Sequence, residues 1–210
     1  LGDTPFSTDI YDVVRDPSID VVVELIGGYD EARSLVLAAI AEGKHVVTAN
    51  KALIAVYGNE IFTAAREKNV IVAYEAGVAG GIPVIKAIRE GLSANRINWL
   101  AGIINGTGNY ILTEMRAGRA FDEVLKEAQD LGYAEADPTF DVEGTDAAHK
   151  LTIMASAAFG VPLQFDRAYT EGISRLTPYD ISHAAARGHR DKHLGTARPR
   201  EDGIELRVHP

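Results

Sequence analysis

Asp146 and Lys150, four positions apart, are the residues of this sequence whose types and spacing are best suited to proton transfer. Side chains four apart in a helix lie on one face, so the two can meet. Residues 147–159 are mostly apolar and are followed by Gly160, which predicts a largely buried helix that ends there. A buried lysine needs a partner or a task. We therefore expect Asp146 to hold Lys150 where it can deliver a proton to an oxyanion.

The acidic stretch before this helix also has plainer interpretations. Five carboxylates fall within residues 135–146, which is typical of a solvated surface loop as well. An EF-hand is excluded, because Val142 stands where that loop needs glycine and Ala148 where it needs glutamate. An ordinary surface ion pair remains open for Asp146 and Lys150. His149 is a possible ligand or base, but it points to another face and favours packing.

Two glycine-rich loops follow predicted strands, yet neither matches a dinucleotide-binding fingerprint. G-T-G-N-Y-I (106–111) has isoleucine in place of the third glycine, and no strand–helix–strand unit surrounds it. We expect it to present backbone donors to a small substrate. G-V-A-G-G (77–81) lacks the Walker lysine pattern, and a tight connection between domains is its plain alternative. The fingerprint of a dinucleotide enzyme is therefore expected upstream of Leu1.

The elements that position these groups alternate between strand and helix over the first 75 residues. Apolar runs at 20–26, 45–48 and 70–74 predict buried strands, and Asp30 and Gly43 are expected to cap and end the helix between the first two. Strands separated by helices form parallel sheets. Such sheets bind ligands at the carboxyl ends of their strands, which here are Gly27-Gly28, Ala49-Asn50-Lys51 and Glu75-Ala76-Gly77.

The second half of the chain has an α+β pattern. Pro83 is suited to the first turn of a helix that ends near Gly91. The alternation from Ile97 to Ile104, with Trp99 on one face, predicts a strand. Further helices are expected over 110–115, 121–131 and 147–159, and a last strand over 204–208.

Charge and composition exclude several classes of protein. The formal net charge of −9 makes a nucleic-acid partner unexpected, because such proteins need a basic face. No apolar run is long enough to span a membrane. The absence of cysteine fits a reducing cytoplasm. The chain shows no signal peptide and does not begin with Met, so we expect a cytoplasmic protein of which this is a middle portion.

Six motifs in this sequence resemble those of homoserine dehydrogenases, in the same order. They are V-V-E-L-I-G-G (22–28), H-V-V-T-A-N-K-A (45–52), Y-E-A-G-V-A-G-G-I-P-V-I (74–85), N-G-T-G-N-Y-I-L-T (105–113), G-Y-A-E-A-D-P-T-F-D-V-E-G-T-D-A-A-H-K (132–150) and Y-T-E-G-I-S-R (169–175). The long acidic motif is highly specific, whereas the glycine loops alone would not be.

The resemblance implies reversible reduction of L-aspartate 4-semialdehyde to L-homoserine with NADH or NADPH, in threonine, methionine and isoleucine synthesis. It implies a partial Rossmann-like domain over 1–76 and an incomplete catalytic and dimerisation domain over 77–210, hence a homodimer. A truncated interaction or regulatory module, and another NAD(P)-dependent amino-acid oxidoreductase, are the alternatives.

The resemblance also assigns roles to residues. Lys150 matches the acid/base lysine, Asp146 its carboxylate partner, and Lys51 a lysine close to cofactor and substrate. The residues that match the substrate site are Glu135, Asp141, Tyr133, Gly106 and Thr107.

Two further sites follow from the same motifs. Gly27 and Gly28 match the edge of the cofactor pocket. Glu75, Val78, Gly80 and Ile82 match a site for a monovalent cation, Na⁺ or K⁺, which is built largely from backbone oxygens.

Overall fold

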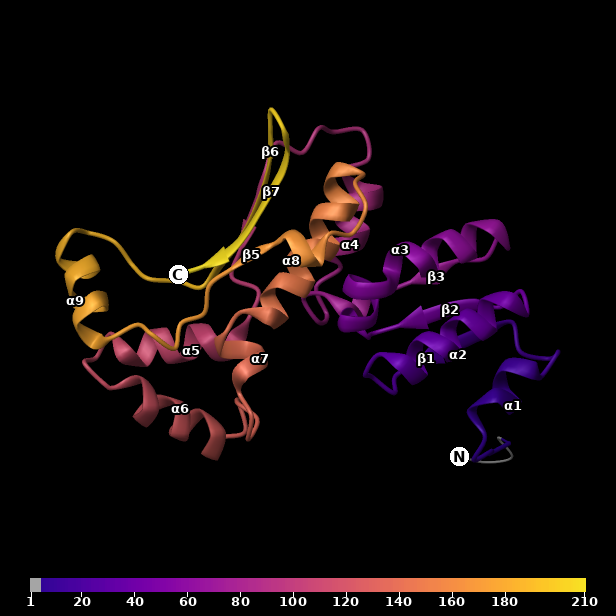
Figure 1. The fold of residues 1–210 in the computed structure, drawn as a ribbon, viewed down its shortest axis with the longest axis horizontal. Helices are drawn as coiled ribbons and strands as arrows, with labels where there is room; N and C mark the ends of the chain where they lie inside the picture. The colour runs from indigo at the N-terminus through magenta and orange to yellow at the C-terminus, as the bar shows by residue number, and fades with distance from the viewer. Residues whose placement is uncertain (1–4) are drawn as a thin grey trace. The chain divides into compact units, whose positions relative to one another are not determined.

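The computed structural model describes residues 5–210, which form two compact units, one ending at Ala94 and the other spanning Asn95–Pro210 (Figure 1). The first is α/β with a parallel sheet and the second is α+β, as the sequence predicts. The expected domain boundary after residue 76 stays a prediction. Within the described part of the chain, no helix has the length and apolar character needed to cross a membrane.

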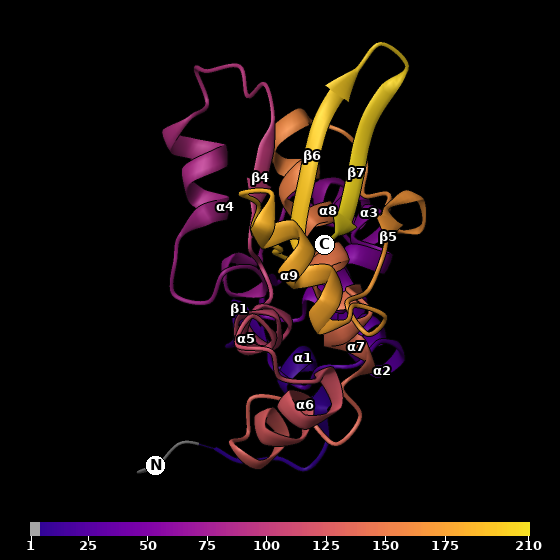
Figure 2. The same cartoon turned by 90° about the vertical axis from the view of Figure 1, so that its left-hand side faces the viewer.

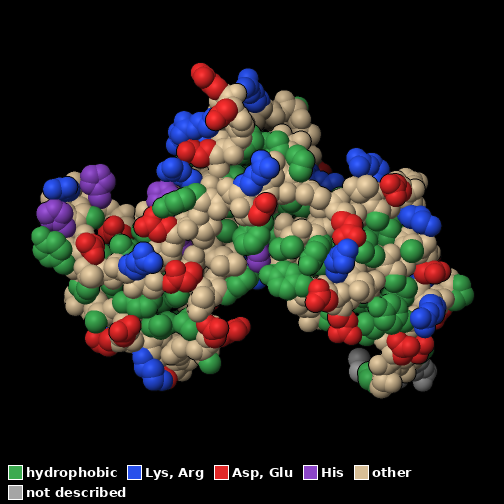
Figure 3. All heavy atoms as spheres, viewed as in Figure 1, with side chains coloured by type: hydrophobic (Ala, Val, Ile, Leu, Met, Phe, Trp, Pro, Cys, Tyr) green, Lys and Arg blue, Asp and Glu red, His purple; other side chains and the backbone are tan. Residues whose placement is uncertain are grey.

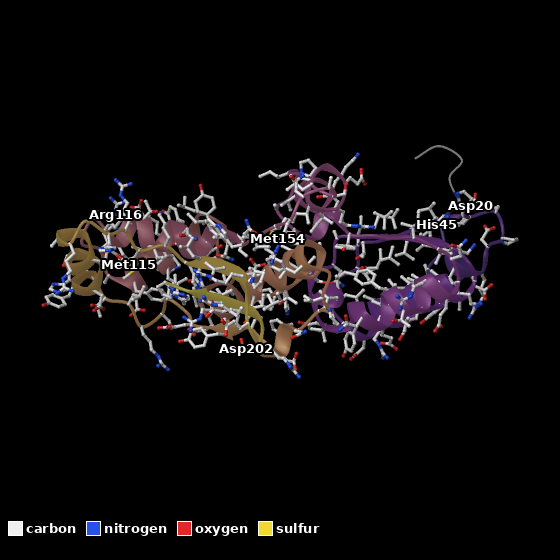
Figure 4. The ribbon with its side chains drawn as sticks, turned by 90° about the horizontal axis from the view of Figure 1, so that it is seen from above. Asp20, His45, Met115, Arg116, Met154 and Asp202 are labelled. Atoms are coloured by element: carbon white, nitrogen blue, oxygen red, sulfur yellow. The ribbon has the colours of Figure 1, made fainter. Side chains whose placement is uncertain are left out.

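The first unit contains a parallel sheet of the order β1-β2-β3. Its strands are Val21–Glu24, His45–Thr48 and Val72–Ala73. The register places Val21 beside His45 and Val46 beside Val72. Figure 4 labels Asp20 and His45 where the first two strands begin, and there the amide of His45 donates to the Asp20 carbonyl at 2.9 Å. The predicted parallel arrangement is therefore confirmed.

Helices connect these strands and cover one side of the sheet. The connecting helices are α2 (Asp30–Ala41) and α3 (Lys51–Glu67). Helix α1 (Ile10–Arg15) precedes β1, and the 3₁₀ turn η1 (Glu75–Gly77), α4 (Val84–Lys86) and the π-helical turn η2 (Ala87–Gly91) follow β3. The apolar stripe of α2 is fully buried, since α2 packs against β1, β2 and α3. Gly43 follows the helix with φ +77°, as a helix-ending glycine does.

Two expectations for this unit were wrong. Asp30 is the first residue of α2 and not its cap, a position held by Tyr29; a carboxylate in the first turn is favoured by the helix dipole. The first strand is also not buried on both faces. Val22 is buried, but Val21 and Val23 are 48% and 59% exposed, because successive side chains of a strand point to opposite faces and α2 packs against β1.

The second unit contains a four-stranded sheet of the order β4-β6-β7-β5 (Figure 2). The strands are Leu100–Gly102, Leu194–Arg200, Gly203–His209 and Tyr169–Thr170 in that order. Strand β6 is antiparallel to both neighbours, and β5 is parallel to β7. Helix α8 (Thr145–Phe159) packs on β6 and β7 and buries Leu151 against Ala197 and Val208.

A second apolar cluster lies between the remaining helices. These are α5 (Gly106–Met115), α6 (Phe121–Asp130), α7 (Thr139–Val142) and α9 (Pro178–Ala186). The 3₁₀ turn η3 (Phe165–Arg167) instead places Phe165 against the cluster beneath α8. The cluster joins Ile111, Leu112 and Met115 of α5 to Val124, Val142, Ile173 and Ile181. Figure 4 labels the end of α5, where Met115 is buried and the next residue, Arg116, is exposed.

The strands of this unit depart from the prediction. The strand expected over 97–104 is limited to Leu100–Gly102, and Trp99 before it is 64% exposed. Strand β6 was not predicted, because L-G-T-A-R-P-R lacks the alternation typical of strands. Pairing with two neighbours overrides this weak local preference. Pro199 is tolerated because it lies beyond the part of β6 that pairs with β4.

Gly172 marks a close approach of two segments, and we predict that Gly172→Ala destabilises the protein. A Cβ there would lie 2.7 Å from the Val142 carbonyl oxygen and 2.8 Å from the Glu143 Cα, both backbone atoms. Overpacking of this kind costs about 1–3 kcal/mol, which thermal or urea unfolding would detect. Gly91→Ala is the control, since nothing lies within 4 Å of its added Cβ; equal stabilities of the two variants would contradict the prediction.

Candidate functional site

Asp146 and Lys150 meet on α8 as the sequence predicts. The Lys150 Nζ lies 2.6 Å from the Asp146 Oδ2, with the Asp146 side chain 6% and the Lys150 side chain 20% exposed. The helix begins at Thr145, one residue after Gly144, which has φ +85°. A surface ion pair is therefore excluded, because the carboxylate is almost fully removed from solvent.

Two consecutive residues before α5 complete the surroundings of this pair. The Ile104 carbonyl accepts a hydrogen bond from Lys150 at 2.9 Å. The side-chain amide of Asn105 donates to Asp146 Oδ2 at 2.9 Å and to Asp141 Oδ1 at 2.7 Å. Its oxygen accepts from the amide of Gly108 at 2.8 Å, which caps α5. The structure thus brings Asp141, Asp146 and Lys150 together around Asn105.

A pocket of about 440 Å³ lies beside the first turn of α5 and is lined by Gly106, Thr107, Tyr110 and Tyr133. The Thr107 hydroxyl donates to the Tyr133 carbonyl at 2.8 Å. The rings of Tyr110 and Tyr133 meet edge to face with centroids 5.2 Å apart. Gly106 is therefore the first residue of a helix whose N-terminal turn faces an open pocket, and not part of a free loop.

Glu135 lies in the segment between α6 and α7. Its side chain is exposed, and its backbone carbonyl accepts from Gln129 at 3.1 Å. No hydrogen bond to Asn105 is described for it, in contrast to Asp141. The predicted substrate residues therefore form a pocket, a hydrogen-bonded carboxylate and an exposed carboxylate, all within the second unit.

Two histidines of this region, His149 and His193, are buried and contact other parts of the fold. His149 is fully buried between Phe140 and Phe165, with ring centroids at 5.3 and 4.2 Å, which supports packing. His193 is 1% exposed and its Nε2 lies 2.9 Å from the Glu171 carbonyl oxygen. A Cβ on Gly144 would lie 3.0 Å from the His193 Cε1, so the glycine that precedes α8 makes room for this ring.

In the first unit, a turn after β1 holds the two glycines predicted for the cofactor edge. Gly27 and Gly28 have φ +73° and +72°, and no atom lies within 4 Å of a Cβ built on either. The Glu24 Oε1 accepts from the amides of Ile26 and Gly27 at 2.9 and 3.1 Å. Its other oxygen accepts from the Thr48 hydroxyl at 2.5 Å. A buried carboxylate therefore holds the turn to the end of β2.

Asn50 and Lys51 follow β2 at the same rim of the sheet. The Asn50 side chain donates to the Gly28 carbonyl at 2.8 Å and accepts from the amide of Leu53 at 3.0 Å. It thereby caps α3, of which Lys51 is the first residue. The open glycine turn and this helix N-terminus are suited to a dinucleotide, because amides and the helix dipole favour anionic groups.

The segment predicted to bind a monovalent cation contains the turn η1 and the residues up to α4. The Glu75 carboxylate accepts from the amides of Ile85 and Lys86 at 2.9 and 2.8 Å, so it caps α4. Val78 is fully buried and Ile82 is 66% exposed. Gly80, like Ala79, has positive φ. Among the described residues no cluster of three acidic, histidine or cysteine side chains is placed to hold a metal.

Sequence reasoning missed Asn105 and Glu24 as organisers of the two sites. Both lie inside motifs that the sequence marks out. Two signals were available in the sequence. Glu24 is a charged residue within the apolar run of β1, and Asn105 stands just before a predicted helix.

A parallel sheet with a glycine turn at its strand ends is typical of α/β proteins that bind nucleotides at that rim. Residues 1–75 match the family model described as homoserine dehydrogenase, NAD binding domain. Residues 83–210 match the model described as homoserine dehydrogenase. The chain therefore belongs to the homoserine dehydrogenase family.

Known homoserine dehydrogenases are similar to this protein along its whole chain. A homoserine dehydrogenase of Pseudomonas aeruginosa is 76% identical over 210 residues, which are 100% of this chain and 48% of the relative. The crystal structure of a homoserine dehydrogenase from Thiobacillus denitrificans matches with a TM-score of 0.96 and 69% identity over 100% of this chain and 49% of that one. A hyperthermophilic archaeal homoserine dehydrogenase in complex with NADPH matches with a TM-score of 0.82 and 27% identity, over 100% and 61%. The chain thus spans about half the length of the curated relatives that it matches.

His193 should make the stability of the second unit depend on pH. Burial lowers the pKa of His193 below its ordinary value of 6.5, although the Glu171 carbonyl and the charges of Glu143 and Glu171 oppose the shift and His209 adds to it. A depressed pKa means that the unfolded chain takes up the proton first as pH falls. The contribution of neutral His193 to the free energy of unfolding is therefore fully present above pH 6.5 and is lost progressively below it.

The test is urea unfolding at a series of pH values from neutral to acidic, with His193→Gln as the comparison. Glutamine cannot be protonated, so the variant should lose less stability on acidification than the wild type does. Parallel losses in the two proteins would show that His193 does not contribute to acid sensitivity.

Proposed function

We propose that the full-length protein is a homoserine dehydrogenase that reversibly reduces L-aspartate 4-semialdehyde to L-homoserine with NADH or NADPH. This places it in threonine, methionine and isoleucine biosynthesis. The observation that carries the proposal is the ion pair of Asp146 and Lys150, at 2.6 Å within the buried helix of the family's most specific motif. The family match favours this reaction over another amino-acid oxidoreductase.

The surroundings of Lys150 support its role as proton donor. Hydride attack on an aldehyde produces an alkoxide, which needs nearby positive charge and a proton. The Lys150 ammonium carries three N–H groups, and Asp146 and the Ile104 carbonyl accept two of them. The third is left for the substrate oxygen. In the oxidation direction, the deprotonated lysine accepts the hydroxyl proton of homoserine.

The first unit would hold the dinucleotide, whose nicotinamide supplies or accepts the hydride. Gly27 and Gly28 form its edge, since the space over both is open. Lys51, at the start of α3, provides a positive charge at the same rim. The relative in complex with NADPH supports this assignment. The family models, which end at residue 75 and resume at 83, support a boundary between domains after residue 76.

The second unit would bind the amino-acid part of the substrate. Glu135 and Asp141 are suited to its ammonium group, and Gly106, Thr107 and Tyr133 line the neighbouring pocket. Asp141 accepts from Asn105 through Oδ1, which leaves lone pairs for a ligand.

A monovalent cation, Na⁺ or K⁺, would bind at Glu75, Val78, Gly80 and Ile82. The Glu75 carboxylate already caps α4, and the remaining donors are backbone carbonyls. Divalent cations usually require several carboxylates, so this donor set favours a singly charged ion.

A homodimer formed through the sheet of the second unit completes the proposal. Helix α8 packs on one face of β6 and β7, and Figure 2 shows the upper part of the opposite face uncovered by other elements of this unit. Trp99 and Ile103, which flank β4, are 64% and 52% exposed. Charged side chains gather at the tip of the β6–β7 hairpin (Figure 3), where Glu205 pairs with Arg200 at 2.7 Å.

Replacing Lys150 tests the function directly. In the full-length enzyme, Lys150→Ala should lower kcat for homoserine oxidation about 10²–10⁴-fold, the scale of a lost general acid or base. Dinucleotide affinity should change little, whereas Lys51→Ala should weaken both rate and cofactor binding. The assay follows the absorbance of the reduced dinucleotide.

Lys126→Ala is the matched control, because Lys126 forms a pair with Asp130 at the same four-residue spacing on the exposed face of α6. Its activity should equal that of the wild type. A wild-type enzyme without homoserine-dependent dinucleotide reduction would overturn the proposed function. If kcat stays near normal in Lys150→Ala and is abolished in Lys51→Ala, then Lys51 is the proton donor.

Replacing Glu135 tests the substrate-binding side. Glu135→Gln removes the negative charge that faces the unreacting amino group, so KM for homoserine should rise more than kcat falls. Steady-state kinetics with varied homoserine measures this. Glu201→Gln, in the exposed turn between β6 and β7, controls for loss of a surface charge. An unchanged KM would remove Glu135 from the site.

A further inference from the structure

Asn105 occupies the point where three parts of the proposed active site meet. It is 5% exposed, and it lies between β4 and α5. Its Nδ2 lies 2.7 Å from Asp141 Oδ1 and 2.9 Å from Asp146 Oδ2, and its Oδ1 accepts from the Gly108 amide at 2.8 Å. All hydrogens of the amide and its oxygen are therefore engaged at once.

The chemistry of this position requires an amide. Two carboxylates that approach one group repel each other unless donors lie between them, and Lys150 forms its ion pair with Asp146. A primary amide offers two N–H donors and an acceptor in one plane. Its reversed orientation would point the oxygen at both carboxylates, so the hydrogen bonds determine one orientation.

We infer that Asn105 is a positioning residue for the reaction: it sets the spacing between the substrate-binding carboxylate Asp141 and the Asp146–Lys150 pair. This inference rests on the proposed function. The preceding residue acts on the same pair, since the Ile104 carbonyl holds Lys150 at 2.9 Å. One short segment thus aligns the proton donor with the group that binds the unreacting end of the substrate. It also ties both to the pocket-lining turn of α5.

A helix cap is the competing explanation, and suitable variants separate the two. Aspartate and serine cap a helix about as well as asparagine does, so Asn105→Asp and Asn105→Ser keep the acceptor for Gly108. Neither can donate to both Asp141 and Asp146. Asn105→Ala removes the cap and the donors together. Thr177→Ala is the matched control, because it removes the capping side chain of α9 in the same unit.

The experiment measures homoserine oxidation by the full-length enzyme, dinucleotide binding by fluorescence titration, and thermal unfolding of each variant. In both Asn105→Asp and Asn105→Ser we expect kcat to fall and KM for homoserine to rise. Each constant should change about 10–100-fold, which is the scale of a lost hydrogen bond to a charged group. Dinucleotide affinity should stay within about twofold, since the second unit alone is altered. Thr177→Ala should lower the unfolding temperature with kinetics unchanged.

The outcomes separate this inference from the proposed function. If Asn105→Asp and Asn105→Ser match the wild type while Asn105→Ala fails, the residue acts as a cap and the inference is wrong. Loss of dinucleotide affinity in step with kcat would also overturn it, by indicating a general structural defect. If Asn105→Asp unfolds, Asn105→Ser decides, because it adds no charge. A wild type that turns over homoserine keeps the proposed function in every one of these cases. A wild type that does not overturns both.

Discussion

A carboxylate buried in the first turn of α8 is the constraint on which the second unit depends. Asp146 is 4% exposed, and an unpaired charge at such a position costs several kcal/mol. Lys150 and Asn105 both donate to its Oδ2. The surrounding structure must supply these donors and hold them in place. The N-cap of α5, the position of Asp141 and the approach of the Ile104 carbonyl to Lys150 all follow from that requirement.

The first unit uses a similar device at the rim of its sheet. Glu24 is 1% exposed at the end of β1, and its two oxygens bind the turn at Gly27 and the hydroxyl of Thr48. Asn50 then connects Gly28 to the start of α3. In both units a buried acidic group and an asparagine connect segments that are distant in the sequence. Hydrogen bonds of this kind hold each segment in one arrangement relative to the next.

Much of the architecture follows from local patterns. The three parallel strands of the first unit, the helix between the first two, the helix ended by Gly160 and the pairing of Asp146 with Lys150 are all predicted from periodicity and spacing. The prediction fails where a partner decides the outcome. Strand β6 has little strand propensity and forms because β4 and β7 pair with it. The strand expected from Ile97 is cut to three residues, Leu100–Gly102, where β6 offers a partner.

The sequence by itself determined the family, the parallel strands of the first unit and the pairing of Asp146 with Lys150, because each depends on residues that are close together in the chain. Only the tertiary structure decided which side chains surround that pair. Asn105 lies 41 positions from Asp146, and the Ile104 carbonyl 46 from Lys150. Such contacts are created when α8 packs against the sheet and the residues before α5 reach its first turn. No local propensity encodes them, since their free energy arises from burial and from hydrogen bonds formed only in the folded chain.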